Sequence, residues 1–143
     1  MADLKADEIS DLAVRWYKAL DVHVPIDQLW PMLAGDDLEM TFPEGVMRGH
    51  EGFAQWYQAV TNRFFDEVHT VKEVSSTIDG ERADVKVVVN WQAKIWDPPA
   101  ANSAWLGFDA YQTWVVSRDA NGNAVILNYV VDELRAMPGS SSL

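Results

Sequence analysis

A carboxylate and a histidine lie two positions apart at the start of a β-branched stretch, as Glu67 and His69. Histidine titrates near neutral pH, so its imidazole can accept or donate a proton during a reaction. A second carboxylate, Asp109, lies in the middle of a later apolar stretch, where a general base could also be held. These residue types indicate proton transfer, with His69 as the first candidate and Asp109 as the second. The alternative for an isolated histidine is a purely structural role.

The histidines of the chain are dispersed, which bears on metal binding. His23 lies in an expected loop, His50 directly precedes a helical stretch, and neither is close in sequence to His69. A catalytic zinc site needs three protein ligands around one ion. The chain also has no cysteine, which excludes disulfides, thiolate ligands and a cysteine nucleophile. We therefore expect neither a catalytic metal ion nor another cofactor.

The chain contains seven tryptophans in 143 residues. They divide between stretches of helical spacing and stretches that alternate: Trp16, Trp30 and Trp56 in the first group, and Trp91, Trp96, Trp105 and Trp114 in the second. Each ring can bury about 150–250 Å² of mostly apolar surface. The sequence thus predicts an aromatic core between helices and a sheet, either closed or opened into a pocket.

Composition limits the classes of partner. The formal charge is −11 and the eleven basic residues are scattered, so a nucleic-acid phosphate backbone would be repelled. The first residues carry acids where a signal peptide needs a basic flank and an apolar stretch. No window is apolar enough for a membrane helix. We expect a soluble, cytoplasmic protein that binds neither nucleic acid nor membrane.

Helical patterns dominate the first half of the chain. Apolar residues with the spacing of an amphipathic helix occupy residues 9–20, and the same pattern returns at 53–64, after Gly49. Residues 25–33 form a shorter helical segment. Residues 38–42 alternate and predict a short strand that is stopped by Pro43.

The second half of the chain has the pattern of a sheet. We expect strands at 68–78, 83–95, 104–118 and 124–134, with an Asp79-Gly80 hairpin turn after the first. Helices followed by a four-stranded meander are typical of an α+β domain. We predict one domain over residues 1–136, with three N-terminal helices packed on a curved, mostly antiparallel sheet. Residues 137–143 are expected to be a disordered tail.

Four stretches resemble a known family. They are LAVRWYKALD, LAGDDLEMTFPEGVMRGHEGFAQWY, the DG hairpin and SRDANGNAVILNYVVDEL. Over about residues 7–135 the chain resembles the nuclear transport factor 2-like, or SnoaL-like, superfamily. The resemblance implies a cone-shaped α+β barrel. Because this superfamily includes isomerases, dehydratases, cyclases, epoxide hydrolases and non-catalytic binders, the resemblance identifies the fold and leaves the reaction open.

Alignment with the ketosteroid isomerases of that superfamily tests one activity. Their tyrosine, carboxylate base and protonated aspartate align with Trp16, Phe42 and Trp114. An indole can only donate a hydrogen bond and a phenyl ring has no polar atom, so ketosteroid isomerase chemistry is excluded. Tyr57 alone matches a supporting tyrosine of that site.

The same alignment implies which strand residues face the interior. They are Val85, Val87, Val89 and Trp91, then Leu106, Phe108, Ala110, Gln112, Trp114 and Val116, then Val125, Leu127, Tyr129 and Val131. One bulge would invert this alternation. A buried amide at Gln112 must find partners; either Tyr129 or the backbone satisfies it, or it binds a ligand. Asp109 has the opposite parity and is expected on the outer face unless a bulge turns it inward.

The expected outer face of the sheet is also rich in large side chains. It carries Val88, Trp96, Trp105, Tyr111, Ile126 and Val130, mixed with polar residues. Large aromatic residues that no helix covers suggest a partner surface. Since members of the superfamily commonly dimerise through this face, we predict a homodimer.

Three hypotheses for function follow. In the first, the protein is a cofactor-independent lyase or isomerase of the dehydratase, isomerase or cyclase type, and His69 transfers a proton on a small, apolar, oxygen-bearing molecule. The ligand would be bound by Trp16, Phe42, Tyr57, Trp91, Gln112, Trp114 and Tyr129. In the second, the same pocket binds a ligand without catalysis. In the third, the protein is a structural dimer whose interior is filled by aromatic side chains.

Overall fold

The computed structural model describes residues 2–143 and places helices on one sheet. Two α-helices and two short 3-10 turns come from the first half of the chain: α1 Ala6–Asp21, η1 Ile26–Gln28, η2 Trp30–Met32 and α2 Gly49–Arg63. The strands are β1 Glu39–Phe42, β2 Gly45–Arg48, β3 Phe65–Asp79, β4 Arg82–Ile95, β5 Ala104–Arg118 and β6 Ala124–Ala136. The predicted α+β class is confirmed.

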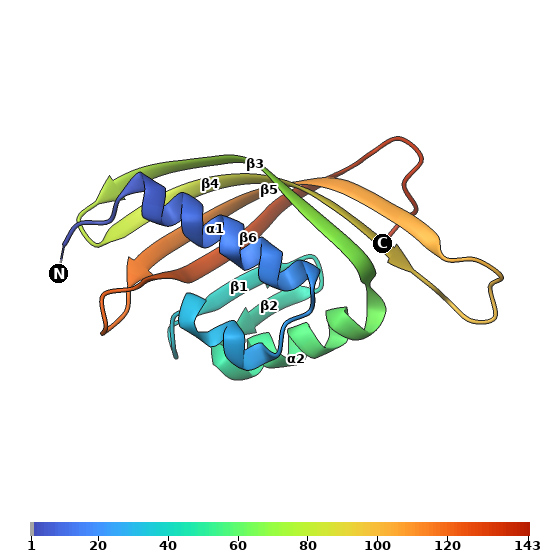
Figure 1. The fold of residues 1–143 in the computed structure, drawn as a ribbon, viewed down its shortest axis with the longest axis horizontal. Helices are drawn as coiled ribbons and strands as arrows, with labels where there is room; N and C mark the ends of the chain where they lie inside the picture. The colour runs from blue at the N-terminus through green and yellow to red at the C-terminus, as the bar shows by residue number, and fades with distance from the viewer. Residues whose placement is uncertain (1) are drawn as a thin grey trace.

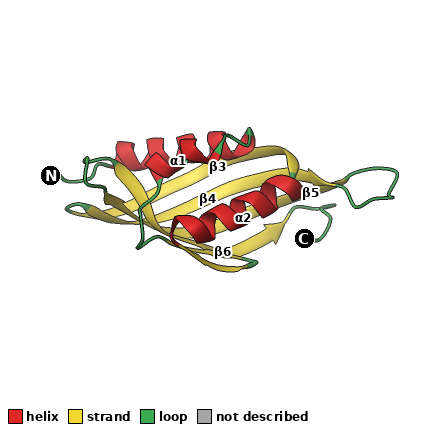
Figure 2. Ribbon diagram, turned by 90° about the horizontal axis from the view of Figure 1, so that it is seen from below, coloured by secondary structure: helices red, strands yellow, loops and turns green. Residues whose placement is uncertain are grey.

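The six strands form one sheet in the order β2-β1-β6-β5-β4-β3. All neighbours are antiparallel except β1 and β6, which run parallel. The long strands bend, and the helices lie on the inner side of the bend, with α1 along β3 (Figures 1 and 2). The sheet is curved but does not close, because β2 and β3 are its two edges and do not pair. The expected barrel is therefore an open cone.

The β1–β2 hairpin shows where local sequence signals were insufficient. We predicted β1, but Pro43 and the short Gly45–Arg48 stretch gave no indication of a strand at β2. In the structure β2 pairs along the whole of β1, with Glu39 opposite Arg48. β1 in turn adds to the edge of β6. The sheet thereby has six strands instead of the four of the meander. Phe42, at the end of β1, packs in the core with residues of the helices.

The alternation on β6 is interrupted by a bulge. Val115 lies opposite Asn128 and Val116 lies opposite Ile126, so Leu127 is an extra residue on β6. The predicted parity, which placed Leu127 inside and Ile126 outside, is therefore wrong at this point. Ile126 is fully buried in the core instead. A bulge inverts the side on which residues lie because side chains alternate with a period of two.

The far end of the molecule is formed by the β4–β5 hairpin, which extends beyond the helices (Figure 1). Trp96 on this hairpin is half exposed, and Trp105 lies over Gly107, where any Cβ would come within 2.5 Å of the indole. The tail that we expected to be disordered makes backbone hydrogen bonds here, from Met137 to Gly107 and from Ser141 to Trp105.

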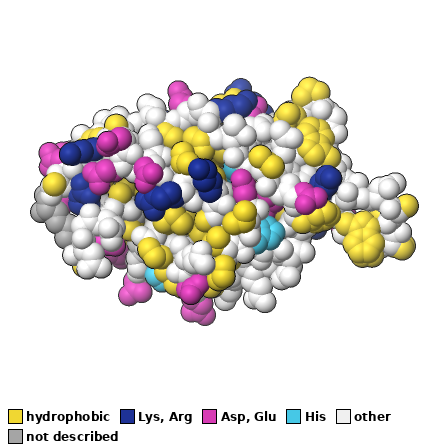
Figure 3. All heavy atoms as spheres, in the orientation of Figure 1, with side chains coloured by type: hydrophobic (Ala, Val, Ile, Leu, Met, Phe, Trp, Pro, Cys, Tyr) yellow, Lys and Arg dark blue, Asp and Glu magenta, His cyan; other side chains and the backbone are white. Residues whose placement is uncertain are grey.

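Charged side chains lie over the face that carries the helices. Lysine and arginine are mixed with aspartate and glutamate on this face and form no separate basic patch (Figure 3). Among residues 2–143, no helix is both long and apolar enough to cross a membrane.

Candidate functional site

A cavity of about 100 Å³ lies between α2, the start of β3 and the inner face of the sheet. Its wall is mostly apolar, with a few polar groups. The apolar lining is Leu20, Phe42, Pro43, Trp56, Val60, Phe64, Val89, Trp91, Ala110, Val131, Leu134 and Leu143, and the polar lining is Glu44, Tyr57, Thr61, Glu67, His69, Gln112 and Tyr129. An apolar wall with a few polar groups is the usual construction of a small-molecule site.

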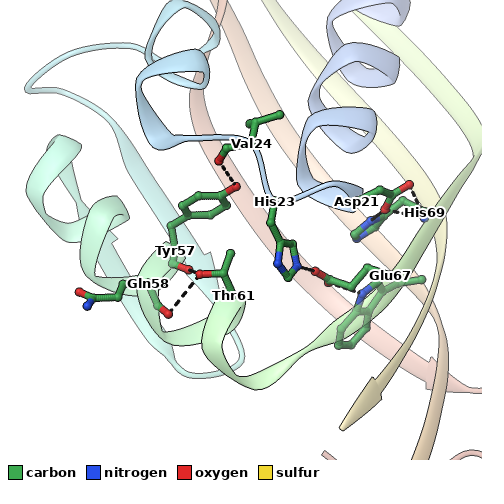
Figure 4. Close-up of polar contacts among 9 residues, drawn as sticks. Asp21, His23, Val24, Tyr57, Gln58, Thr61, Glu67 and His69 are labelled. Atoms are coloured by element: carbon green, nitrogen blue, oxygen red, sulfur yellow. Dashed lines mark hydrogen bonds and ion pairs between the residues drawn. The ribbon is translucent and has the colours of Figure 1, made fainter.

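His69 is held at this cavity by Asp21, the last residue of α1. Its Nδ1 lies 2.6 Å from Asp21 Oδ1, and the same carboxylate accepts the backbone N–H of His69 at 3.0 and 3.1 Å. The side chains of His69 and Asp21 are 10% and 21% exposed. Figure 4 shows the pair where α1 meets β3. The carboxylate thus fixes both the backbone and the ring of His69.

The Asp21 carboxylate also determines which ring nitrogen of His69 can act as a base. An ionised carboxylate only accepts hydrogen bonds, so in the neutral imidazole Nδ1 carries the hydrogen and Nε2 carries the lone pair. No side chain or backbone group among residues 2–143 is hydrogen-bonded to Nε2. Tyr17 stacks on the imidazole with ring centroids 4.8 Å apart. The ring of His69 is therefore oriented, with Nε2 as the nitrogen that has no partner in the described part of the chain.

The turn that ends α1 supplies Asp21 and also His23. The backbone N–H of His23 donates to the Leu20 carbonyl and that of Val24 donates to the Ala19 carbonyl, which is the Schellman pattern of a helix C-terminus. This pattern requires a left-handed residue, and His23 takes it with φ 50°. Glycine is the usual residue at this position, so a histidine here accepts some backbone strain.

His23 forms a second histidine–carboxylate pair with Glu67. Its Nε2 contacts Glu67 Oε2 at short range, while Glu67 Oε1 accepts the indole N–H of Trp91 at 3.0 Å. The side chain of Glu67 is 10% exposed and that of His23 is 28% exposed (Figure 4). Both oxygens of this cavity-lining carboxylate thus have fixed partners.

α2 is attached to the same turn through Tyr57. The Tyr57 hydroxyl donates to the Val24 carbonyl at 2.7 Å. Burial, and then the negative charge of Glu67, raise the pKa of Tyr57, so the phenol stays protonated and keeps donating. The turn at residues 21–24 therefore connects α1, α2 and β3 around one side of the cavity.

The sheet side of the cavity carries a neutral network centred on Gln112. Its Oε1 accepts from the Trp114 indole and from the Tyr17 hydroxyl, both at 2.9 Å. Because an indole can only donate, the atom that faces Trp114 must be the amide oxygen. The Tyr17 and Tyr129 hydroxyls lie 3.2 Å apart. The acceptor end of Gln112 is satisfied within the protein, and its amide nitrogen is the other end of a side chain that lines the cavity.

Burial keeps both phenols of this network neutral. Desolvation raises the pKa of Tyr17 well above its ordinary value, and the neighbouring Tyr129 adds to the increase. Desolvation likewise raises the pKa of Tyr129, against smaller opposing effects from hydrogen bonds. The network has no charge at neutral pH.

The structure brings six of the nine predicted site residues to the cavity and separates the other three. His69 lines it together with Phe42, Tyr57, Trp91, Gln112 and Tyr129. Trp16 and Trp114 are fully buried in the core behind this wall. Asp109 lies on the outer face, where it accepts from Asn90 at 3.0 Å and pairs with Lys72. Asn90 and Lys72 lower the pKa of Asp109, which suits a stable ion pair better than a base.

Sequence reasoning missed the groups that hold the histidine. Asp21 and His69 are 48 positions apart, and His23 and Glu67 are 44 apart. A signal was available, because Asp21 and His23 alternate at the end of the first helix as Glu67 and His69 do at the start of a strand. Within residues 2–143, no group of three His, Asp or Glu side chains is arranged to hold a metal ion.

A family model for the SnoaL-like domain matches residues 4–122. The chain belongs to the SnoaL-like domain family. The match runs from the residues before α1 into the turn after β5 and confirms the resemblance found in the sequence. No curated protein matches the sequence.

Solved structures show the same fold at low identity. A hexachlorocyclohexane dehydrochlorinase, LinA-type3 from Novosphingobium barchaimii, is 15% identical with a TM-score of 0.74, over 96% of this chain and 92% of that one. A proposed scytalone dehydratase from Novosphingobium aromaticivorans is 14% identical with a TM-score of 0.74, over 96% and 88%. A nuclear transport factor 2-like protein from Salmonella enterica is 14% identical with a TM-score of 0.73, over 96% and 92%. For this SnoaL-like domain, such similarity shows the fold alone.

Proposed function

We propose that this SnoaL-like domain is a cofactor-independent enzyme of the dehydratase, isomerase or cyclase type. It acts by proton transfer on a small, largely apolar molecule that carries oxygen. The observation that carries the proposal is the His69–Asp21 pair at the wall of an apolar cavity, with Nδ1 held at 2.6 Å and Nε2 left to accept a proton. Two of the similar structures are a dehydrochlorinase and a proposed dehydratase, which is consistent with elimination chemistry.

In this proposal His69 is the base and Asp21 is its positioning residue. Nε2 removes a proton from a carbon next to a carbonyl group, and the Asp21 carboxylate stabilises the imidazolium that forms. The Gln112 amide nitrogen lies on the opposite wall, where it can donate to the carbonyl oxygen as it gains negative charge. The Tyr129 hydroxyl lies beside it and donates to Tyr17, whose own hydrogen goes to Gln112. The apolar wall limits access of water and so strengthens these interactions.

The cavity limits the size of the ligand. A cavity of about 150 Å³ in another protein holds one benzene molecule. The cavity here, at about 100 Å³, is of the same order. The part of the ligand that is buried is therefore about one ring or a short branched chain, and ketones of that size are suitable probes.

Hydrogen exchange on a ketone without a leaving group tests the base directly. The probe is 4-phenylbutan-2-one in D₂O, with exchange of the hydrogens next to the carbonyl followed by NMR. We expect exchange with the wild-type protein and a loss of at least about 100-fold with His69→Gln, which is the usual range for a general base. The matched control is His50→Gln, because His50 is bonded to the Ala34 carbonyl at 2.8 Å and does not line the cavity.

The same experiment distinguishes the alternatives. Tryptophan fluorescence reports binding of the probe next to Trp91. Binding without exchange would overturn the enzymatic proposal in favour of a non-catalytic binder. If the probe neither binds nor exchanges its hydrogens, the hypothesis of a structural protein would remain.

We also propose that the chain forms a homodimer through the outer face of the sheet. Support comes from Trp105 and Tyr111 on this face, which α1 and α2 do not cover. The mass in solution should then be twice 16.1 kDa, measured by light scattering at micromolar concentration. A mass of one chain would contradict the dimer without affecting the proposed activity.

A further inference from the structure

The second histidine–carboxylate pair lies next to the first and has no role in the proposed proton abstraction. Glu67 and His69 are two residues apart on β3, a separation of about 6–7 Å along a strand, and both line the same cavity. Their partners, His23 and Asp21, come from one turn. The cavity thus carries two separate proton-carrying groups on one edge.

The two pairs differ in what each can do. In the first, the carboxylate lies behind the histidine, and the imidazole is the group that faces the cavity. In the second the order is reversed: the Glu67 carboxylate lines the cavity and His23 lies behind it. An imidazole with a free lone pair suits a base, whereas a carboxyl that shares a proton with a histidine suits a proton donor.

An elimination reaction needs a proton donor only for some leaving groups. A carboxylate or a halide leaves as a stable anion, whereas a hydroxyl group must take up a proton as the C–O bond breaks. A protein that removes a hydroxyl group therefore gains from an acid beside its base, and one that removes a stable anion does not.

We propose that Glu67, supplied with protons by His23, is the general acid of this site, and that the substrate class is a β-hydroxy carbonyl compound that loses water. This inference rests on the proposed function of His69 as the base. In the reaction, the C–H bond next to the carbonyl breaks and its proton goes to His69 Nε2. The electron pair forms the C=C bond, the C–O bond breaks, and the leaving oxygen takes the proton shared by Glu67 and His23. The products are an unsaturated carbonyl compound and water.

The surroundings of Glu67 allow the acid to be recharged. Its side chain is 10% exposed, while that of His23 is 28% exposed, so His23 can take a proton from solvent and return it to the pair. The other groups that face Glu67 are the Trp91 indole, which donates to Oε1, and the Tyr57 phenol. Neither can supply a proton readily, since an indole is not acidic and the pKa of Tyr57 is raised.

Three related compounds separate the acid from the base. The first, 4-phenylbutan-2-one, has no leaving group and reports proton abstraction alone. The second is the acetate ester of 4-hydroxy-4-phenylbutan-2-one, whose leaving group needs no proton. The third is 4-hydroxy-4-phenylbutan-2-one itself, which must lose hydroxyl. The last two give the same conjugated enone, which is followed by its ultraviolet absorbance.

Glu67→Gln should lower turnover of the hydroxyl compound at least about 100-fold and change the other two reactions less than threefold. The glutamine keeps an oxygen for the Trp91 N–H, so the fold is retained. The matched control is Asp66→Asn, which removes a neighbouring carboxylate that is paired with Lys94 outside the cavity. Asp66 has φ 51°, which asparagine tolerates.

His23→Gly tests the supply of protons, since glycine accepts the left-handed backbone at this position. Turnover of the hydroxyl compound should fall, and added imidazole should restore it, which a purely structural role would not allow. An equal effect of Glu67→Gln on the hydroxyl compound and the ester, or no effect on either, would overturn the inference while His69 remains the base. Loss of wild-type exchange on the first compound would instead overturn the proposed function.

Discussion

The two walls of the cavity use polar side chains in opposite ways. On the α1 side, Asp21, His23, Glu67 and His69 form histidine–carboxylate pairs whose side chains are 10–28% exposed. On the sheet side, the groups are neutral and almost completely buried: Gln112 at 5%, Trp114 at 0% and Tyr129 at 4% exposed, together with Tyr17 of α1 at 2%, which bonds to them.

This difference distinguishes the side chains that we propose transfer protons from those that hold Gln112 in place. Groups that exchange protons need a path to solvent and a charge that can change, and the α1 side has both. The buried network has neither, and its hydrogen bonds fix the orientation of a single amide. Substitutions at Tyr17 and Trp114, which bond to Gln112 without lining the cavity, should therefore affect mainly stability, and substitutions in the pairs should affect mainly turnover.

Trp114→Ala should have the largest effect. This indole is fully buried and donates to Gln112, so its removal leaves a large cavity and takes away one of the two donors to the amide oxygen. We expect the free energy of unfolding to fall by about 3–5 kcal/mol, measured by urea denaturation. Trp96→Ala, at a ring that is 52% exposed, should change it by less than about 0.5 kcal/mol. Similar losses at both positions would contradict the comparison.

Asp21→Asn should act on turnover. An amide can donate to Nδ1 of His69 and so stabilise the tautomer that carries its hydrogen on Nε2, which cannot accept a proton. We expect ketone hydrogen exchange to slow about 100-fold, equivalent to about 2.7 kcal/mol. The asparagine oxygen still accepts the backbone N–H of His69, so stability should change by less than about 1 kcal/mol. A stable variant with full exchange activity would show that the tautomer is not controlled by Asp21.

Tyr17→Phe should act on stability. It removes one of the two donors to the Gln112 oxygen, a bond of 2.9 Å, and leaves Tyr129 without its hydroxyl neighbour. The expected loss is about 1–2 kcal/mol in the free energy of unfolding. The Kd of the ketone probe, from tryptophan fluorescence, should change little. A tenfold loss of affinity with unchanged stability would place Tyr17 in ligand binding.

Alkaline pH should weaken the wild-type network. The pKa of Tyr17 and that of Tyr129 are raised in the folded state above the ordinary 10.0, so the unfolded chain loses these protons first. Stability is fully present below pH 10.0 and should decrease as the pH rises above it. Urea midpoints between pH 8 and 11 measure this slope, which should be shallower in Tyr17→Phe. An unchanged slope in that variant would contradict the assignment.

His23→Gly should have the smallest effect on stability. It relieves the left-handed strain at φ 50° and removes the contact between His23 and Glu67, whose side chains are 28% and 10% exposed. We expect these two effects to be about 1 kcal/mol each, with opposite signs. The free energy of unfolding should stay within about 1 kcal/mol of the wild type, measured with urea. A loss above 2 kcal/mol would mean that the pair is a structural element like the buried network.

Hydrophobic periodicity was sufficient to predict most of the fold. The stripe at residues 9–20 and the alternation along 83–95 each reflect one buried face, and the structure has α1 and β4 there. The alternation along the strands also predicted that Gln112 and Tyr129 face inward, and both line the cavity. It failed at Ile126, because a bulge is decided by pairing with a neighbouring strand and leaves no local pattern.

The site was predictable only in part, for a related reason. The sequence indicated His69 by its chemistry, but Asp21 is 48 positions away and becomes its partner only when α1 lies along β3. Trp16 and Trp114 were assigned to the ligand because they were inward and aromatic. The inward orientation of a side chain does not show whether it lines the cavity or lies in the core behind the wall. That depends on how far its ring lies from the opening of the cavity.

The position at which α1 stops has a consequence for variation in this family. One inserted residue in a helix turns everything after it by about 100°, and it would swing the carboxylate of residue 21 and the imidazole of residue 23 away from β3 together. Insertions or deletions before that turn should therefore remove the partners of the proposed base and of the proposed acid at once. Relatives that keep the chemistry should differ in loops and strand ends while the number of residues in the first helix, counted back from its last turn, is preserved.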